Sequence, residues 1–479
     1  MNVLRPALLS LALLAAPFLA QGANDLPSLG DASSSIVSPE QEFQMGRAWL
    51  SMLRGQVPTI NDPQLKQFVE QTVYKLAETS DLQDHRLVFI LIKDPEINAF
   101  AAPGGVIGVN GGLFLKSETE AEYAAVMAHE LGHLIQRHFA RGVENQQRMQ
   151  LPLMAALLAG IVAAAAGGGD VGIAAIASTQ AAAIQSQLRF SRLNEQEADR
   201  VGIVNLERAG YDPRAMPEMF GRLARQYRYD RTPPEFLLTH PVTDSRIADT
   251  QARAERFPKG GVEDSKRFQL MKVRTQMYFE ETAGLLVKRY RAQLQEAPDN
   301  DPVRYGLAMG LTKQGQLNEA RDTLAPLLRK APDDISYNLA QVDLDITANR
   351  LPDAQKRVQR LMDLYPDDLA VSLAQVDMLG RTKQAKAASQ LLDKLIKQRP
   401  IDPDLWNQAA DVRGQAGDLV GVHQARAEYF ALTGDYNQAI QQLGFAKQRA
   451  ASNYQLAARI DARQQEMIAQ RKLSEEILR

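Results

Sequence analysis

The sequence predicts a mainly α-helical chain in which an α+β domain with a small sheet precedes an α-solenoid. Three features predict this fold: an apolar run typical of a buried strand before residue 93, a long Ala-rich helical segment after Ser117, and prolines that recur every 34 residues. Of the 479 residues, we expect 1–22 to form a signal peptide, 23–257 the α+β domain and 258–479 the solenoid.

The composition is that of an ordinary globular protein, with 45% hydrophobic and 23% charged residues. A net charge of −2 argues against a nucleic-acid binder, which would show a basic excess. The chain has no cysteine, so it forms no disulfides and offers no N-terminal cysteine for a lipid anchor.

The N-terminus has the features of a secretory signal peptide. Arg5 precedes an apolar run at 7–16, and the small residues Ala20 and Gly22 follow it. A transmembrane anchor is the alternative, but the run is too short to cross roughly 30 Å of hydrocarbon. We therefore expect cleavage near Gly22 and a secreted or periplasmic protein.

Two segments predict the small sheet. Arg86–Lys93 is a β-rich apolar run bounded by charges, as buried strands are. Asn98–Asn110 holds two short apolar stretches around a Pro-Gly-Gly turn. Because proline cannot donate to a strand ladder, Pro103 favours an edge position for this segment over one in mid-sheet.

Two helices are expected after these strands. Ser117 and Glu120 match a capping box, which predicts a helix from there through about His138. A second helix is expected over Phe190–Arg208, where Gly210 and a following proline end it.

Between these helices, Leu151–Ile184 is almost uncharged and rich in Ala and Gly. Its length would allow a membrane span, but Gly167–Gly169 and Asp170 interrupt a weakly apolar stretch. We therefore favour a flexible or interfacial helical hairpin, which predicts peripheral contact with a membrane.

The second half of the chain is a repeat. Small or apolar residues recur in one register with a proline before each fresh helix, and a 34-residue period of this kind is the tetratricopeptide signature. The residues in register are Pro298, Pro332, Pro366 and Pro400; Ala308, Val342, Val376 and Ala410; and Ala320, Ala354, Ala388 and Val422. Each repeat leaves an apolar face for its neighbour, so we expect a superhelix with a concave groove.

His129 and His133 stand four residues apart on a predicted helix and therefore share one face. Both imidazoles can bind one zinc ion about 2 Å away. Glu130, about 100° round the helix, can reach a water at the metal rather than the metal itself. Because zinc lowers the pKa of such a water to about 7, Glu130 can take its proton and pass it to the leaving amine. The pattern predicts a zinc-dependent endopeptidase with one ion per chain.

A catalytic zinc ion needs a third protein ligand. Glu195 and Asp199 share a helix face, so Glu195 can bind the metal while Asp199 hydrogen-bonds a ligating histidine. Glu197 is the alternative ligand, and spacing favours Glu195 over it only modestly. His138, five residues after His133, is expected to be a surface or capping residue.

These motifs resemble those of peptidase family M48. The HExxH block at 129–133 is followed by Glu195-x-x-x-Asp199, and the Asn98–Gly105 and His240–Arg246 segments match two further blocks of the family. The resemblance implies a gluzincin-type metallopeptidase domain, and it implies Glu195 as the third zinc ligand.

Within that family, the whole chain is most similar to periplasmic members with a C-terminal repeat array. The resemblance implies a periplasmic location and proteolysis of misassembled outer-membrane β-barrel proteins, with a chaperone-like role in their assembly. The implied partners are those unfolded or misassembled proteins and their assembly machinery, bound through the repeat groove. Membrane-embedded members act on lipidated peptides, but their flanking transmembrane helices are missing here, so we do not expect those substrates.

Two further segments have candidate roles at the site. Asn98, Ala99, Phe100 and Ala101 lie in the predicted edge segment, which would bind a substrate as an added strand, although it would equally serve as a structural hairpin. His240 is a candidate fourth metal ligand that would displace the water, or a group that stabilises the oxyanion, and Arg246 is a further candidate catalytic residue. A purely structural histidine is the remaining interpretation.

The leading hypothesis is therefore a periplasmic zinc endopeptidase with a client-recruiting repeat array. A second hypothesis is a non-proteolytic repeat-based adaptor or chaperone with a dormant zinc site. A third is an integral membrane protease anchored through residues 151–184.

Overall fold

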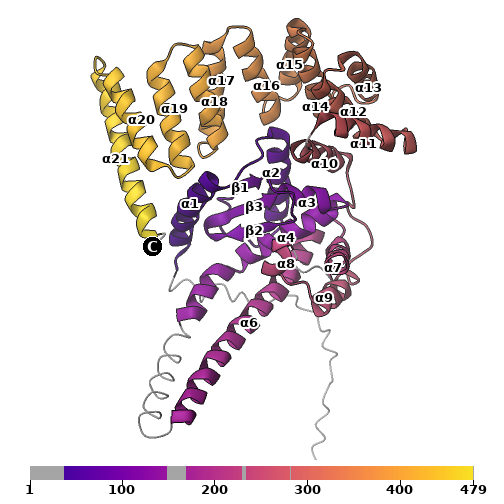
Figure 1. The fold of residues 1–479 in the computed structure, drawn as a ribbon, viewed down its shortest axis with the longest axis vertical. Helices are drawn as coiled ribbons and strands as arrows, with labels where there is room; N and C mark the ends of the chain where they lie inside the picture. The colour runs from indigo at the N-terminus through magenta and orange to yellow at the C-terminus, as the bar shows by residue number, and fades with distance from the viewer. Residues whose placement is uncertain (1–36, 148–168, 229–233, 281, 478–479) are drawn as a thin grey trace, which may run out of the picture.

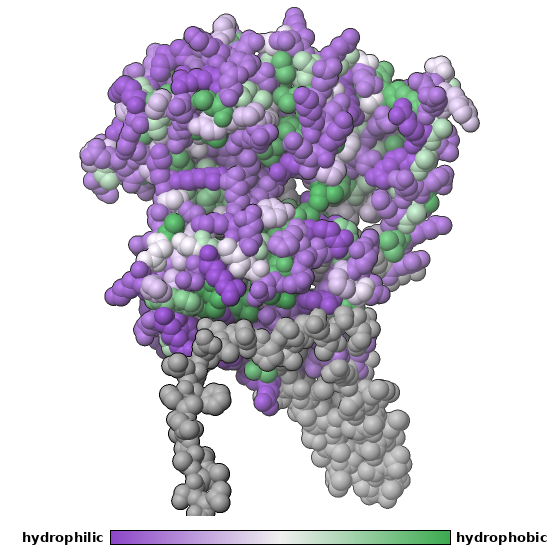
Figure 2. Space-filling model, turned by 180° about the vertical axis from the view of Figure 1, so that it is seen from behind, coloured by the Kyte–Doolittle hydropathy of each residue, from purple (hydrophilic) through white to green (hydrophobic). Residues whose placement is uncertain are grey.

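A computed structural model describes residues 37–147, 169–228, 234–280 and 282–477 (Figure 1). The predicted signal peptide lies outside these residues. An N-terminal part, residues 37–257, surrounds a small sheet, and a repeat array, residues 283–477, arches over it (Figure 1). The space-filling view shows a hollow between the two parts, with hydrophobic surface beside it (Figure 2).

The sheet has three strands in the order β1-β3-β2. β1 (Val88–Ile92) pairs in parallel with β3 (Val106–Asn110), and β2 (Ala99–Ala102) pairs with β3 in the antiparallel sense. The predicted turn connects β2 to β3 through Gly104, whose φ of 69° suits glycine. The predicted edge position is right for β2 and wrong for β3, which is the central strand. Pro103 lies in the turn rather than in a strand, so it does not keep β3 from pairing on both sides.

Helices pack around this sheet and form the core of the N-terminal part. At the centre of that core, the rings of Phe68, Phe114, Tyr123 and Phe268 contact one another. The described helices are α1 (Pro39–Gln56), α2 (Pro63–Glu78), α3 (Gly111–Lys116), α4 (Glu120–Ile135), α6 (Gly169–Arg208), α7 (Ala215–Gln226), α8 (Glu235–Thr239) and α9 (Asp244–Ala254).

Helix α4 differs from the prediction at both ends. Its N-cap is Thr119, whose hydroxyl accepts from the backbone N–H of Glu122, whereas Ser117 ends α3 instead. The helix stops at Ile135 because Arg137 takes a left-handed φ of 49°. A new helical segment then begins at His138.

Helix α6 is longer than predicted, since it begins at Gly169 and not at Phe190. It contains the second half of the predicted interfacial hairpin, and the first half lies outside the described residues. No helix in the described part of the chain is both long and apolar enough to span a membrane.

The repeat array confirms the 34-residue period. All eight predicted register positions from Ala308 to Val422 are buried. The turns between the paired helices also share a register, since Gly315, Asn349, Lys383 and Gly417 all have positive φ. The helices are α11 (Ala283–Glu296), α12 (Asp301–Gln314), α13 (Leu317–Lys330), α14 (Ile335–Thr347), α15 (Leu351–Leu364), α16 (Leu369–Arg381), α17 (Ala385–Gln398), α18 (Pro403–Gln415), α19 (Leu419–Leu432), α20 (Tyr436–Arg449) and α21 (Tyr454–Ile477).

Helix α10 (Lys266–Phe279) joins the array to the N-terminal part. Its Arg274 donates to the carboxylate of Asp62 at distances of 2.6–3.2 Å and to the hydroxyl of Tyr305 in α12 at 2.8 Å. Asp62 also caps α2, accepting from the backbone N–H groups of Gln64 and Leu65. One buried ion pair therefore links the start of α2 to the first repeats.

We predict that Asp62→Ala lowers the free energy of unfolding by about 3–5 kcal/mol, because it leaves the Arg274 charge buried and unpaired. Asp377→Ala is the control, since Asp377 and its partner Arg381 are both more than 40% exposed, and such pairs contribute about 0.5 kcal/mol or less. Chemical denaturation of both variants measures the difference, and equal losses would contradict the assigned role.

Candidate metal centre

The site lies where α4 packs against α6. Glycines allow the two backbones to approach closely: a Cβ at Gly132 would lie 2.8 Å from the carbonyl oxygen of Ala198, and one at Gly202 would lie 3.0 Å from that of Ala128. The α6 residue Glu195 thereby reaches the face of α4 that carries both predicted zinc-binding histidines.

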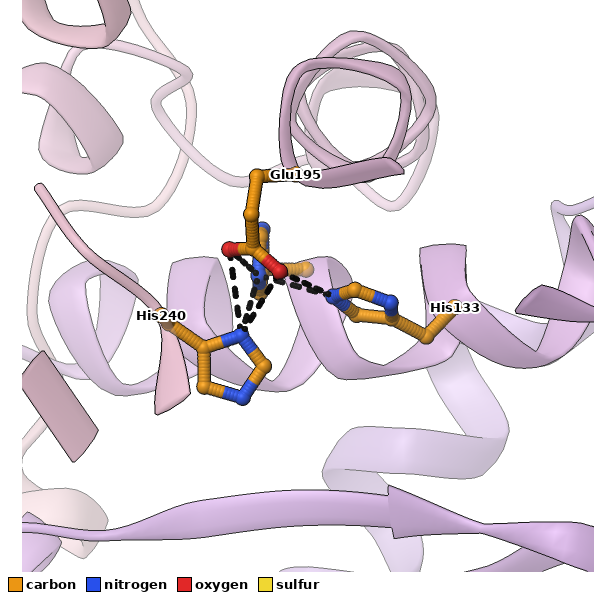
Figure 3. Close-up of side chains that lie close together, drawn as sticks. His133, Glu195 and His240 are labelled. Atoms are coloured by element: carbon orange, nitrogen blue, oxygen red, sulfur yellow. Dashed lines mark hydrogen bonds and ion pairs between the residues drawn. The ribbon is translucent and has the colours of Figure 1, made fainter. Parts of the chain in front are cut away.

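Four donor side chains converge there: His129, His133, Glu195 and His240 (Figure 3). One ligand atom from each lies within 4.8 Å of all the others. The Nε2 atoms of His129 and His133 are 3.1 Å apart, and each lies 3.4 Å from an oxygen of Glu195. Donors that share one tetrahedral zinc ion at about 2 Å are about 3.3 Å apart, so the residues fit this metal.

His240 comes from the C-terminus of α8 and completes the cluster. Its Nδ1 lies 3.1 Å from the carboxylate of Glu195 and 3.3 Å from Nε2 of His129. Its Nε2 lies 3.5 Å from Glu130, on the other side of the ring. His240 therefore stands between the predicted ligands and the predicted general base.

Glu130 is fully buried beside the cluster, yet neither oxygen of its carboxylate has a hydrogen-bond partner among the described residues. A buried polar group without a partner is costly, which suits a group that receives its partner from water or substrate. Burial raises the pKa of Glu130 above its ordinary value. A carboxylate of raised pKa accepts a proton more readily at neutral pH.

Asp199 and Arg246 hold the first histidine in place. The Nδ1 of His129 lies 2.9 Å from Asp199, and Arg246 donates twice to Asp199 at 2.7 Å. Arg246 also lies 3.0 Å from Glu195. Burial alone would raise the pKa of Asp199, but hydrogen bonds from Arg246 and His129 lower it below its ordinary value, so the carboxylate keeps its charge and fixes the imidazole.

His138 holds the second histidine, His133, in place. This role of His138 was not predicted from the sequence. The expectation of a surface or capping residue is wrong, because His138 is buried with its Nδ1 2.8 Å from Nδ1 of His133. Its Nε2 lies 3.3 Å from Glu197, which in turn accepts from Arg141 at 2.8 Å. A straight helix would carry His138 away from His133, and the left-handed turn at Arg137 returns it.

The predicted substrate segment divides between two surroundings. Ala101 lines a cavity of about 360 Å³ together with Glu130, His133 and His240. Phe100 turns its ring toward Trp49, at 5.6 Å between centroids, and the side chains of Asn98 and Ala99 are buried. Only the end of β2 therefore borders the metal centre, through its backbone and the small side chain of Ala101.

The cavity beside the centre is mainly apolar. Its walls include Leu82, Leu134, Ile135 and Phe139, and the Glu42–Arg137 ion pair closes one side. A space of this kind, open to the orphan carboxylate of Glu130, can take an apolar side chain of a peptide.

Comparison with known proteins agrees with this geometry. Residues 63–254 match the model of peptidase family M48, and residues 287–344 match a tetratricopeptide repeat model. The chain is 35% identical over 453 residues to the beta-barrel assembly-enhancing protease of Escherichia coli (strain K12), covering 94% of this chain and 92% of the relative. The chain belongs to peptidase family M48. It is a zinc metalloprotease that carries a repeat array for protein–protein interaction.

Two other relatives show how far the likeness extends. A putative beta-barrel assembly-enhancing protease of Vibrio cholerae is 34% identical, with 93% of each chain covered. The mitochondrial metalloendopeptidase OMA1 of Arabidopsis thaliana is 32% identical over 173 residues, which is 36% of this chain and 32% of the relative. The likeness to the first reaches into the repeats, whereas the likeness to the second spans a stretch no longer than the protease domain.

We predict that Asp199→Asn lowers zinc affinity about 10- to 100-fold, because the amide no longer fixes the His129 imidazole by charge. Asp249→Asn is the matched control, since Asp249 pairs with Arg253 on α9 and is 35% exposed. Competition with a chromogenic chelator measures both affinities, and an unchanged value for Asp199→Asn would contradict this role.

We also predict that His138→Ala lowers zinc affinity, about 10-fold or more, because His133 loses its hydrogen-bond partner. His423→Ala is the control: it also removes a hydrogen-bonded histidine, but one in the repeat array. If both variants bind zinc as the unaltered protein does, His138 is not a positioning residue.

Proposed function

We propose that this M48 protease is a periplasmic endopeptidase that degrades unfolded or misassembled outer-membrane β-barrel proteins and assists their assembly. The convergence of four donor side chains beside an orphan carboxylate supports the proteolytic role. The names of its relatives, which are beta-barrel assembly-enhancing proteases, support the substrate class. The segment at 1–22, with its short apolar run, supports export through a cleaved signal peptide.

In this proposal, His129, His133 and Glu195 hold one zinc ion. When bound, the ion supplies Lewis acidity that polarises the scissile carbonyl and acidifies water. Glu130 takes a proton from the attacking water on one carboxylate oxygen and returns it to the leaving amine nitrogen. Asp199 and Arg246 keep His129 and Glu195 in place through the contacts given above.

We further propose that His240 is a fourth ligand in the resting protein. Its Nδ1 lies inside the donor cluster at distances like those between the other ligands. A histidine there occupies the place that water needs, so it restrains cleavage until a substrate displaces it. Such restraint suits a protease that resides among unfolded proteins.

The substrate binds, in this proposal, as an added strand on β2. Strand addition recognises the backbone, so it accepts many sequences provided that they are extended. Of the predicted residues, Ala99, Phe100 and Ala101 lie in this strand and Asn98 directly precedes it, and Ala101 borders the same cavity as Glu130. The repeat array recruits clients or their assembly machinery. In this proposal, the same protein acts both as an adaptor and as a protease.

We predict that Glu130→Gln leaves zinc binding unchanged but lowers the rate of proteolysis about 100- to 10,000-fold, because the amide cannot accept the proton. Metal content is measured by mass spectrometry, and cleavage is measured on an unfolded outer-membrane β-barrel protein. Cleavage at the unaltered rate would remove Glu130 from the mechanism.

We predict that His240→Ala raises the basal rate of cleavage of the same unfolded substrate, because the restraining ligand is gone. His85→Ala, which changes a histidine outside the cluster, should have no effect. A fall in kcat with unchanged zinc content would instead assign His240 to the oxyanion.

A further inference from the structure

The sheet has a second free edge, far from the metal centre. In the order β1-β3-β2, β2 borders α4 and the zinc ligands, whereas β1 is the opposite edge and faces the repeat array (Figure 1). A cleft of about 380 Å³ separates β1 from the array. It is lined by the face of α2 that carries Lys66, Glu70 and Tyr74 and by the segment 398–404 between α17 and α18.

The edge of β1 is covered at one end only. The backbone N–H of Ile60 donates to the carbonyl of Leu91 at 2.9 Å, and that of Lys93 donates to Pro58 at 2.8 Å. This antiparallel pairing stops at Ile60, because Asp62 caps α2 and the chain leaves the sheet. The preceding part of β1 pairs with β3 on one side only, and its other edge lies beside the cleft without a neighbouring strand.

Backbone groups of alternate strand residues point to the same side. Phe89 therefore directs its N–H and C=O toward the same edge as Leu91 and Lys93. In the described part of the chain, no hydrogen bond reaches either group of Phe89 at this edge, nor the N–H of Leu91. An edge strand with unpaired backbone groups is a template for pairing with another chain.

The charged side chains around the cleft are paired with one another. Lys66 contacts Asp402 and Asp404, and Arg399 contacts Glu70. Arg54 donates to the backbone carbonyl of Ile401 at 3.1 Å. What the cleft offers a ligand is therefore the strand backbone and the apolar surface of Phe89 and Tyr74, whose rings lie 5.7 Å apart.

We propose that the β1 edge is a second peptide-binding site, which takes an unpaired β segment of a client as an added strand. Main-chain hydrogen bonds to Phe89 and Leu91 supply the affinity, and alternate apolar side chains pack on Phe89 and Tyr74. A segment held there lies across the sheet from Glu130, so it is bound without being cut. The site deepens the proposed chaperone-like role and rests on it for the identity of the client.

The absence of native cysteine makes a clean test available. Ile401 lines the cleft and is 40% exposed, and Leu364, in α15 and outside the cleft, is 47% exposed. Ile401→Cys and Leu364→Cys are made in the full-length Glu130→Gln protein, which prevents cleavage of the probe. The probe is a synthetic peptide of alternating Val and Thr with one central cysteine activated as a mixed disulfide.

We expect Ile401→Cys to capture the peptide about 10-fold faster than Leu364→Cys, after correction for the reactivity of each thiol toward a small reagent, because binding raises the local peptide concentration. N-methylation of alternate peptide amides should abolish the difference, since it removes the main-chain donors. Equal capture rates, or undiminished capture of the methylated peptide, would overturn the proposal. Disulfide-linked dimers formed at the same position without peptide would overturn it too, by assigning the edge to a second copy of the chain.

The experiment is independent of proteolysis, because its protein is inactive and its readout is covalent capture. Failed capture leaves the proposed cleavage of β-barrel proteins intact. Failed cleavage by the unaltered protein leaves the capture result intact.

Discussion

The close contact between α4 and α6 is the constraint on which the metal centre depends. Gly132 and Gly202 each face the backbone of the other helix, and a methyl group at either position would meet a carbonyl oxygen at 3.0 Å or less. At a larger separation, the short side chain of Asp199 would not reach His129, and Glu195 would not reach both histidines. The two glycines thus let the donors of α4 and α6 share one site.

The buried charges at the centre are arranged so that each supports another. Burial penalises all of them, yet Asp199 and Glu195 both keep lowered pKa values because histidines and Arg246 bond to them. Glu130 stands apart from this network, and its pKa is raised. The same helix pair therefore lowers the pKa of Glu195 and raises that of Glu130, as the proposed roles of metal ligand and proton acceptor require.

Local patterns in the sequence predicted most of the fold and part of the candidate site. The repeat period, the strands and the shared face of His129 and His133 are periodic or short-range features, and each is confirmed. The expected surface position of His138 was wrong because its position depends on one residue in the left-handed conformation, Arg137. Periodicity in the sequence cannot predict such a residue. The register of helix α6 against α4 was equally invisible, so spacing could not choose firmly between Glu195 and Glu197. In the structure, Glu195 lies in the donor cluster, whereas Glu197 contacts His138 and Arg141.

Two of the three strands in this sheet are edge strands. Unpaired edge strands promote aggregation, and proteins usually cover them. Here each edge has a different neighbour. α4 and the metal centre border β2, whereas α2 and the repeat array enclose the uncovered part of β1. In the two proposals taken together, one way of reading a backbone has two outcomes, because the surroundings of the two edges differ. A peptide on β2 would meet Glu130, whereas a peptide on β1 would meet paired charges and no reactive group. The order β1-β3-β2 places the proposed holding site and the proposed cutting site on opposite edges of the sheet.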